Sequence, residues 1–181
     1  GLLVALAACV AGLHQAQVVD ADYFQPEAPI RLGSSLLFTA LAHLFGPPAE
    51  DGQLGLLSPV AFAGWVGLFI TAFNLLPIGQ LDGGHVVYAL FGRAHARVAR
   101  LCFAVLLGLG LYGILSVLRD WPAGWPGWLA LAFLVLLLGR DHPAPRDEQM
   151  ALNPARRFAG YVCLAVFALC ITPVPFAYTG P

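Results

Sequence analysis

The sequence predicts an all-α fold, a polytopic bundle of about five transmembrane helices. Hydrophobic residues make up 59% of the 181 residues, and charged residues make up only 10%. A soluble domain is about half apolar and about a quarter charged, so too few charges remain here to cover a water-facing surface. Long apolar runs also alternate with short polar loops that contain Pro and Gly. Lipid is therefore the expected solvent for most of the chain.

The expected spans are apolar runs close to the length of about 20 residues that crosses the hydrocarbon of a bilayer. They cover residues 1–19, 58–76, 101–118, 125–139 and 155–171. The second begins at Ser58-Pro59, which is typical of a helix start with Pro in the first turn. The chain starts inside an apolar run without the features of a signal peptide. We therefore expect residues 1–181 to form a single membrane domain that is the C-terminal part of a longer protein.

One apolar segment is too short to cross a bilayer. Residues 34–45 have helical character and begin with Ser, but the segment has only 12 residues. It lies in the mixed, acidic stretch of residues 20–57. An interfacial or re-entrant segment is expected near residues 34–57.

The second expected span is followed by a predicted break in the helix. Pro77 lacks the N–H that a helix interior needs, and Gly79, Gly83 and Gly84 tolerate dihedrals that other residues resist. The pattern predicts one broken helix at Pro77–Gly84, with unwound backbone around Asp82. Such backbone persists at membrane depth only where protein or a water-filled cavity covers it.

Asp82 is the one acidic residue outside the polar loops. A carboxylate at membrane depth is costly unless it is paired, protonated or bound to a metal, so Asp82 is a candidate functional residue. The structural alternative is a helix cap, in which the carboxylate accepts N–H bonds from the next helix.

The basic residues are all Arg and are unevenly distributed. Seven of the nine fall in residues 92–100 and 140–157, two loops separated by two expected crossings. By the positive-inside rule, both loops are predicted to be cytoplasmic. No basic face suited to nucleic acid is present, so nucleic acid is not an expected partner.

Small residues inside the apolar runs are predicted to serve packing. The four Cys residues form no CxxC pair and are read as buried hydrophobic side chains. Gly64 and Gly67 are expected to allow close approach of another helix.

The segment from Asn74 to Gly83 reads N-x-x-P-x-x-x-L-D-G. In a polytopic apolar context, this ten-position pattern resembles the second signature of the site-2 protease family, which are intramembrane zinc metalloproteases. The resemblance is strong over residues 58–92 and loose elsewhere. The flanking residues resemble a bacterial or archaeal branch, which implies a bacterial or archaeal cell membrane.

The resemblance implies roles for individual residues. Asp82 would be a zinc ligand, and the Asn74 amide would lie at the catalytic site, where it could bond the substrate or a developing oxyanion. Pro77, Gly83 and Gly84 would shape the break. His85 is a possible support for the site, as a cap or as a partner of a ligand. The implied cofactor is Zn²⁺, and the implied partner is a single-span membrane protein that is cleaved within its transmembrane segment.

The chain departs from the family pattern in one respect. The family takes two His ligands and a Glu general base from an H-E-x-x-H helix, and none of the five His here belongs to such a motif. That helix is expected before Gly1. This chain would then supply the Asp ligand only and would be inactive alone.

Two other classes of function stay open at this point. A non-catalytic pseudoprotease or membrane scaffold would keep the fold and lack the two His. An ion-coupled transporter would also use a broken helix with a buried carboxylate. It predicts a second, symmetry-related break with a second intramembrane acid, and the sequence has neither.

Overall fold

The computed structural model describes residues 1–20, 30–48, 50, 53–119, 121, 124–138 and 152–178. Most described residues are helical, and the chain divides into two compact units. Unit 1 contains Gly1–Ala72 and Leu169–Pro181, and unit 2 contains Phe73–Ala168. The expected single domain stays a prediction.

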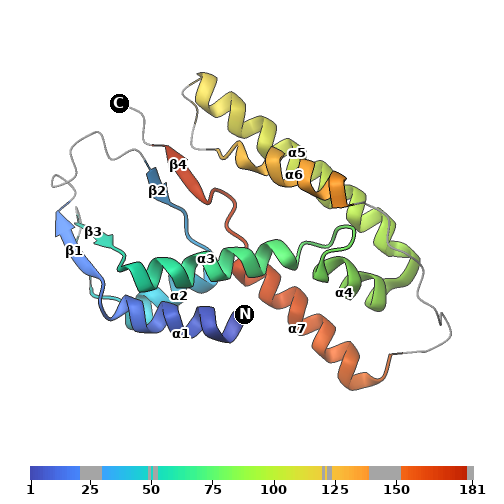
Figure 1. Ribbon diagram of the computed structural model, residues 1–181, viewed down its shortest axis with the longest axis horizontal. Coiled ribbons are helices and arrows are strands. Elements are labelled where there is room, and N and C mark those ends of the chain that lie inside the picture. Colours follow the sequence, from blue (N-terminus) through green and yellow to red (C-terminus); the bar gives the residue numbers. More distant parts are fainter. Residues whose placement is uncertain are drawn as a thin grey trace. The chain divides into compact units, whose positions relative to one another are not determined.

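Unit 1 is built on two helices packed closely together, α1 (Leu2–Leu13) and α3 (Pro59–Asn74, to Ala72). A Cβ on Gly12 would overlap the backbone of Ala61, and one on Gly64 would overlap Cys9. Further along, a Cβ on Gly67 would lie 2.7 Å from the Cβ of Ala5. Position numbers fall on α1 as they rise on α3, so the two helices are antiparallel (Figure 1). The predicted packing role of Gly64 and Gly67 is confirmed.

The start of α3 is as predicted. Pro59 is its first residue, and the Ser58 hydroxyl accepts a hydrogen bond from the Ala61 N–H at 3.1 Å. The same hydroxyl donates to the Gly12 carbonyl at 2.8 Å, which joins this cap to the end of α1. One serine therefore both caps α3 and fixes its contact with α1.

Short strands, which an all-α fold does not include, are present in unit 1. β1 (Gln17–Asp20) pairs antiparallel with β3 (Gln53–Leu56), and β2 (Ile30–Leu32) pairs antiparallel with β4 (Phe176–Tyr178) (Figure 1). The expected first span is correspondingly too long, because α1 ends at Leu13. Polar residues after Leu13 and the β-branched pair Val18-Val19 favour the strand instead.

A tryptophan joins the β2–β4 sheet to α3. The Trp65 Nε1–H donates to the Gly33 carbonyl at 2.8 Å, and its ring meets Phe176 edge-on at 5.4 Å. Trp65 is fully buried. The remaining helix of unit 1, α2 (Leu36–Phe45), begins at the Ser35 N-cap, whose side chain accepts from the Phe38 N–H. This confirms a short helix with a Ser start, and its interfacial or re-entrant position stays a prediction.

Unit 2 contains the helices that follow the break. They are α4 (Asp82–Phe91), the 3₁₀ turn η2 (Gly92–Ala94), α5 (His95–Arg119), α6 (Gly127–Leu138) and α7 (Pro154–Cys170, to Ala168). α5 and α6 lie side by side (Figure 1). Their contact is close, because a Cβ on Gly113 would overlap Trp125 and Pro126. The Ser116 hydroxyl accepts from the Gly124 N–H at 3.1 Å and so fixes the end of this hairpin.

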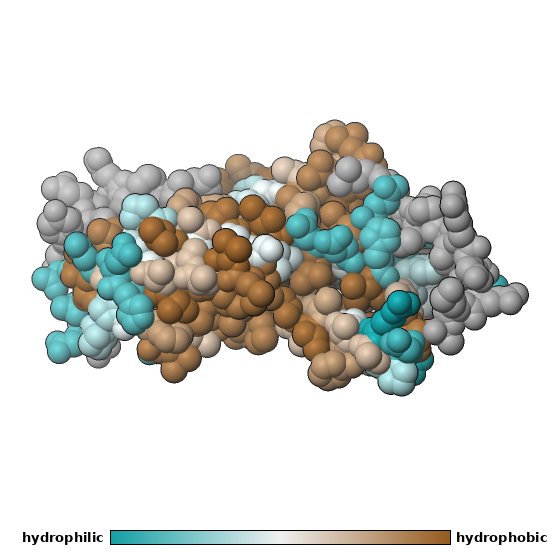
Figure 2. Space-filling model, turned by 60° about the horizontal axis from the view of Figure 1, so that its bottom comes forward, coloured by the Kyte–Doolittle hydropathy of each residue, from teal (hydrophilic) through white to brown (hydrophobic). Residues whose placement is uncertain are grey.

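One helical stretch among the described residues, Asp82–Arg119, is long and apolar enough to cross a membrane. Only 22% of its most apolar window is buried by the rest of the protein. Leu101 and Leu118 within it are 68% and 70% exposed. Figure 2 shows the same property on the face that it draws, where hydrophobic side chains cover large areas. The five-span arrangement stays a prediction, and most of the loop at 140–157 lies outside the described residues.

Candidate metal-ligand site

The helix break runs from Leu75 to Leu81, because α3 ends at Asn74 and α4 begins at Asp82. We call this segment, with its two flanking residues, the Asn74–Asp82 turn. The expected break at Pro77–Gly84 is therefore wrong at its second boundary, since Gly83 and Gly84 are already helical. A helix N-terminus carries partial positive charge, so an Asp in the first turn favours an early start of α4.

Two buried aliphatic side chains hold the turn in place. Leu76 and Ile78 are 2% and 0% exposed. The backbone closes on itself through bonds from the Leu76 N–H to the Phe73 carbonyl and from the Leu81 N–H to the Ile78 carbonyl, at 3.1 and 3.3 Å. The turn is thus an ordered element and not a loose connection.

The glycine of the turn and the two glycines at the start of α4 serve two different purposes. Gly79 has a φ of 56°, in the left-handed region that favours glycine. Gly83 and Gly84 lie instead against carbonyl groups of the turn. A Cβ on Gly83 would overlap the Leu75 carbonyl oxygen, and one on Gly84 would overlap that of Gly79. The sequence predicts unusual dihedrals at all three glycines, but only Gly79 has a positive φ. The close backbone approach at Gly83 and Gly84 leaves no signal in the sequence.

This close approach joins the two ends of the turn, where two of its polar residues, Asn74 and Asp82, lie. Asn74 is the last residue of α3, and Asp82 is the first residue of α4. Their chain neighbours Leu75 and Gly83 are in direct contact. The side chains of Asn74 and Asp82 are both exposed. The turn therefore presents an amide and a carboxylate from adjacent points of the backbone.

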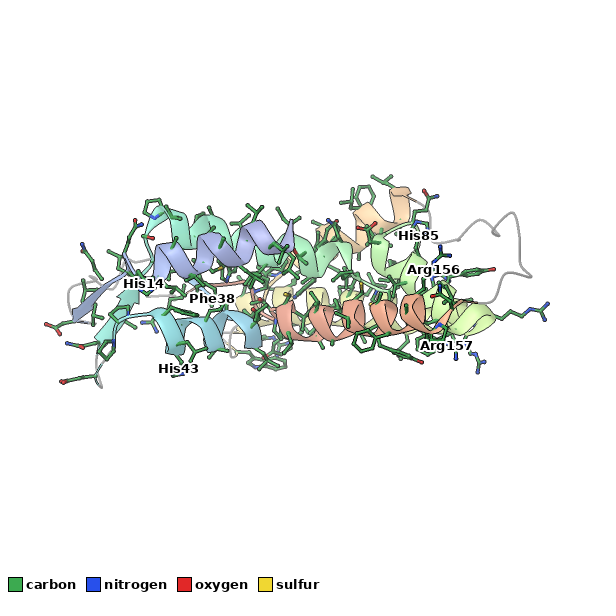
Figure 3. All side chains as sticks on the ribbon, turned by 90° about the horizontal axis from the view of Figure 1, so that it is seen from below. His14, Phe38, His43, His85, Arg156 and Arg157 are labelled. Atoms are coloured by element: carbon green, nitrogen blue, oxygen red, sulfur yellow. The ribbon has the colours of Figure 1, made fainter. Side chains whose placement is uncertain are left out.

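Asp82 is not the N-cap of α4. The N-cap is Leu81, and no side-chain capping bond forms there. The carboxylate is thus left available for a ligand. His85 lies three residues further along α4, so it falls on the same side of the helix, and it is exposed as well (Figure 3).

Among the residues that the structure describes, the donor set is incomplete for a tightly held metal. Within the described ranges, no cluster of three or more His, Cys, Asp or Glu side chains could hold an ion. A catalytic zinc site has three protein ligands and one open position. Asp82 fits one oxygen ligand of such a site.

Comparison with known proteins identifies the family. Residues 29–113 match the family described as "Peptidase family M50", the site-2 protease family, and this range contains the whole Asn74–Asp82 turn. Over this region the chain is similar to the site-2 protease family. M50 proteases are membrane proteins, which agrees with the apolar exposed surfaces. No solved structure matches the chain.

Three named relatives are chloroplast proteins of plants. "Probable zinc metalloprotease EGY2, chloroplastic" of Arabidopsis thaliana is 31% identical over 90% of this chain and 26% of its own length. "Probable zinc metalloprotease EGY3, chloroplastic" of Oryza sativa subsp. indica is 35% identical over 70% of this chain and 20% of its own. "Probable zinc metalloprotease EGY1, chloroplastic" of Arabidopsis thaliana is 34% identical over 62% of this chain and 21% of its own length.

The chain thus spans about a quarter or less of the length of these relatives. Their chloroplast origin does not support the expected bacterial or archaeal cell membrane. The motif alone did not distinguish a chloroplast protein from a bacterial or archaeal one. Its residues shape a metal site, and the same site can form in any of these membranes.

Proposed function

We propose that this chain is the Asp-bearing part of an intramembrane zinc-dependent endopeptidase. The observation that carries the proposal is the Asn74–Asp82 turn, which presents an exposed carboxylate and an exposed amide within the segment that matches Peptidase family M50. The names of the relatives, which include zinc metalloproteases, support the same class.

In this proposal Asp82 is one protein ligand of Zn²⁺. The two His ligands and the Glu general base belong to an H-E-x-x-H helix outside residues 1–181, so the chain alone is inactive. When bound, the zinc ion would acidify a water molecule and polarise the substrate carbonyl. The Asn74 amide binds the substrate carbonyl or the negative charge that develops on it.

The proposed substrate is a single-span protein cleaved within its transmembrane segment, such as a membrane-tethered regulator. Peptide bonds inside a helix are shielded, so the substrate must unwind before cleavage. An unwound segment satisfies its backbone groups by pairing as an extended strand. The Arg-rich loops 92–100 and 140–157 are proposed to lie on one side of the bilayer, the cytoplasmic side by the positive-inside rule.

The first test is to read the coding sequence before Gly1. An H-E-x-x-H motif on an apolar helix is expected there. If the gene begins near Gly1, or its preceding helix lacks the two His, the alternative of a non-catalytic pseudoprotease or membrane scaffold replaces the proposal.

The second test is Asp82→Asn in the full-length protein, which keeps the side-chain shape and removes the charge. Loss of partners that merely orient a ligand costs 10- to 100-fold, so loss of a direct ligand should lower zinc content and cleavage by at least about 100-fold. Zinc is measured by elemental analysis, and cleavage is measured on a reconstituted single-span substrate.

The matched control is Asp20→Asn, which removes a carboxylate from strand β1 and should leave both quantities unchanged. Equal zinc content in the wild-type protein and Asp82→Asn would refute the assignment of Asp82 as a ligand.

A further inference from the structure

Five arginine side chains are exposed at one end of unit 2. They lie on η2, on the first turns of α5 and on the first turn of α7. Figure 3 labels the two arginines on α7. They are Arg93, Arg97, Arg100, Arg156 and Arg157. We call this set the arginine surface.

Contacts between α4 and α7 bring these arginines to the same end. A Cβ on Gly160 would lie 3.0 Å from the Leu90 side chain, and the rings of Phe91 and Tyr161 meet edge-on at 6.5 Å. Leu90 and Phe91 end α4 just before Arg93, and Gly160 follows Arg157 by less than one turn. The arginines of η2 and α7 therefore flank a single packed contact.

The arginine surface has little negative charge to neutralise it. In the described part of unit 2, Asp82 is the one carboxylate. Over the two loops 92–100 and 140–157, seven Arg and three acidic residues leave a formal charge of +4. Like charges gathered in this way repel each other, so an anionic partner is favoured.

Apolar side chains beside the arginines indicate where this end lies relative to lipid. Phe91, Phe158 and Tyr161 are 45%, 70% and 50% exposed. Leu101, which is 68% exposed, directly follows Arg100 and begins the apolar part of α5. The change from guanidinium groups to exposed aromatic and aliphatic side chains is typical of the boundary between headgroups and hydrocarbon.

From this combination we propose that the arginine surface binds the phosphates of anionic phospholipids in the surrounding bilayer. Guanidinium groups match phosphate in charge and in hydrogen-bonding geometry. Neighbouring aromatic rings would sit at the headgroup level beside the bound lipid. The inference needs only that the protein lies in a membrane, so it stands or falls independently of the proposed protease activity.

The test measures the lipid selectivity of the full-length protein reconstituted in phosphatidylcholine vesicles. A trace of spin-labelled phosphatidylglycerol or spin-labelled phosphatidylcholine is added, and electron paramagnetic resonance gives the fraction of each lipid held by the protein. We expect the protein to prefer phosphatidylglycerol over phosphatidylcholine by about fivefold or more. A fivefold preference corresponds to the attraction between one arginine and an anionic lipid surface. The preference should fall in 0.5 M salt, because exposed charges are screened.

Variants test whether positive charge at this surface, and not elsewhere on the protein, carries the preference. Replacing all five arginines by Gln should abolish the preference, whereas replacing them by Lys should keep most of it. The control Arg119→Gln, at the opposite end of α5, should behave as the wild-type protein. Circular dichroism checks that each variant retains its helix content.

Several outcomes would overturn the proposal. They are an equal affinity for both lipids, a preference that survives the five Gln substitutions, and a preference that is insensitive to salt. Full displacement of phosphatidylglycerol by millimolar inorganic phosphate or by a soluble acidic peptide would also overturn it, since the site would then recognise a free anion or a protein segment and not a lipid.

Discussion

Glycines shape two regions of this protein in different ways. On the α1–α3 contact of unit 1, Gly12 and Gly64 meet residues of a neighbouring helix that is distant in sequence. In unit 2, Gly83 and Gly84 at the start of α4 meet carbonyl groups of the Asn74–Asp82 turn, eight and five residues earlier in the chain. The first region determines whether two helices can associate. The second determines the path of the backbone next to one carboxylate.

The two regions should therefore respond differently to the addition of a side chain. A methyl group in the turn should move Asp82 and affect the proposed metal site. A larger side chain on α3 should separate two helices and affect stability.

The largest effect is expected for Gly83→Ala in the full-length protein. The new Cβ would overlap the Leu75 carbonyl, so α4 must shift and carry Asp82 with it. A displacement of about 1 Å at a catalytic group can cost about 100-fold, and we expect a loss of cleavage of that size. Zinc content should fall in parallel. Full activity in this variant would show that the close approach does not position Asp82.

A smaller but clear effect is expected for Gly64→Val, which acts on unit 1. Its side chain would collide with the backbone and thiol of Cys9. Overpacking of a close contact costs typically 1–3 kcal/mol, so we expect a loss of about 2 kcal/mol in the free energy of unfolding, measured with denaturant in detergent micelles. An unchanged unfolding midpoint would contradict the close α1–α3 packing.

The smallest effect is expected for Gly108→Ala, which is the control for both. Gly108 lies inside α5 and is exposed, and no atom lies within 4 Å of an added Cβ. Ala is favoured over Gly in a helix interior by about 0.5–1 kcal/mol, so this variant should be as stable as the wild-type protein or slightly more stable. Cleavage should not change. A destabilised Gly108→Ala variant would mean that this face of α5 packs against something absent from the structure.

Local signals predicted much of the fold from sequence. Ser58-Pro59 marked the start of α3, Pro77 marked its end, and a Ser marked the start of α2. The strands were not predictable in the same way, because each has only three or four residues and is stabilised by a partner distant in the chain. Val18 and Val19 favour a strand, but only four residues separate them from an apolar run that resembles a membrane span.

For the candidate site, the sequence suggests residues but not their geometry, and the assignment of Asp82 as a ligand stays a prediction. A lone acidic residue in an apolar stretch identified Asp82, and the surrounding motif indicated zinc. The helical start at Asp82 was not evident, because Gly83-Gly84 usually indicates irregular backbone. The contact of these glycines with the carbonyls of Leu75 and Gly79 depends on the folded path of the turn, which no residue type encodes.

The pairing of β2 with β4 has a consequence for how the protein is made. Ile30 pairs with Tyr178, so β2 cannot pair until β4, about 150 residues later in the sequence, has been synthesised. During synthesis, every helix between them is made first. The Trp65 bond to Gly33 can form earlier, because both residues precede the break. The β2–β4 sheet is thus the last part of unit 1 that can close, and until then the edge of β2 that pairs with β4 has no partner strand.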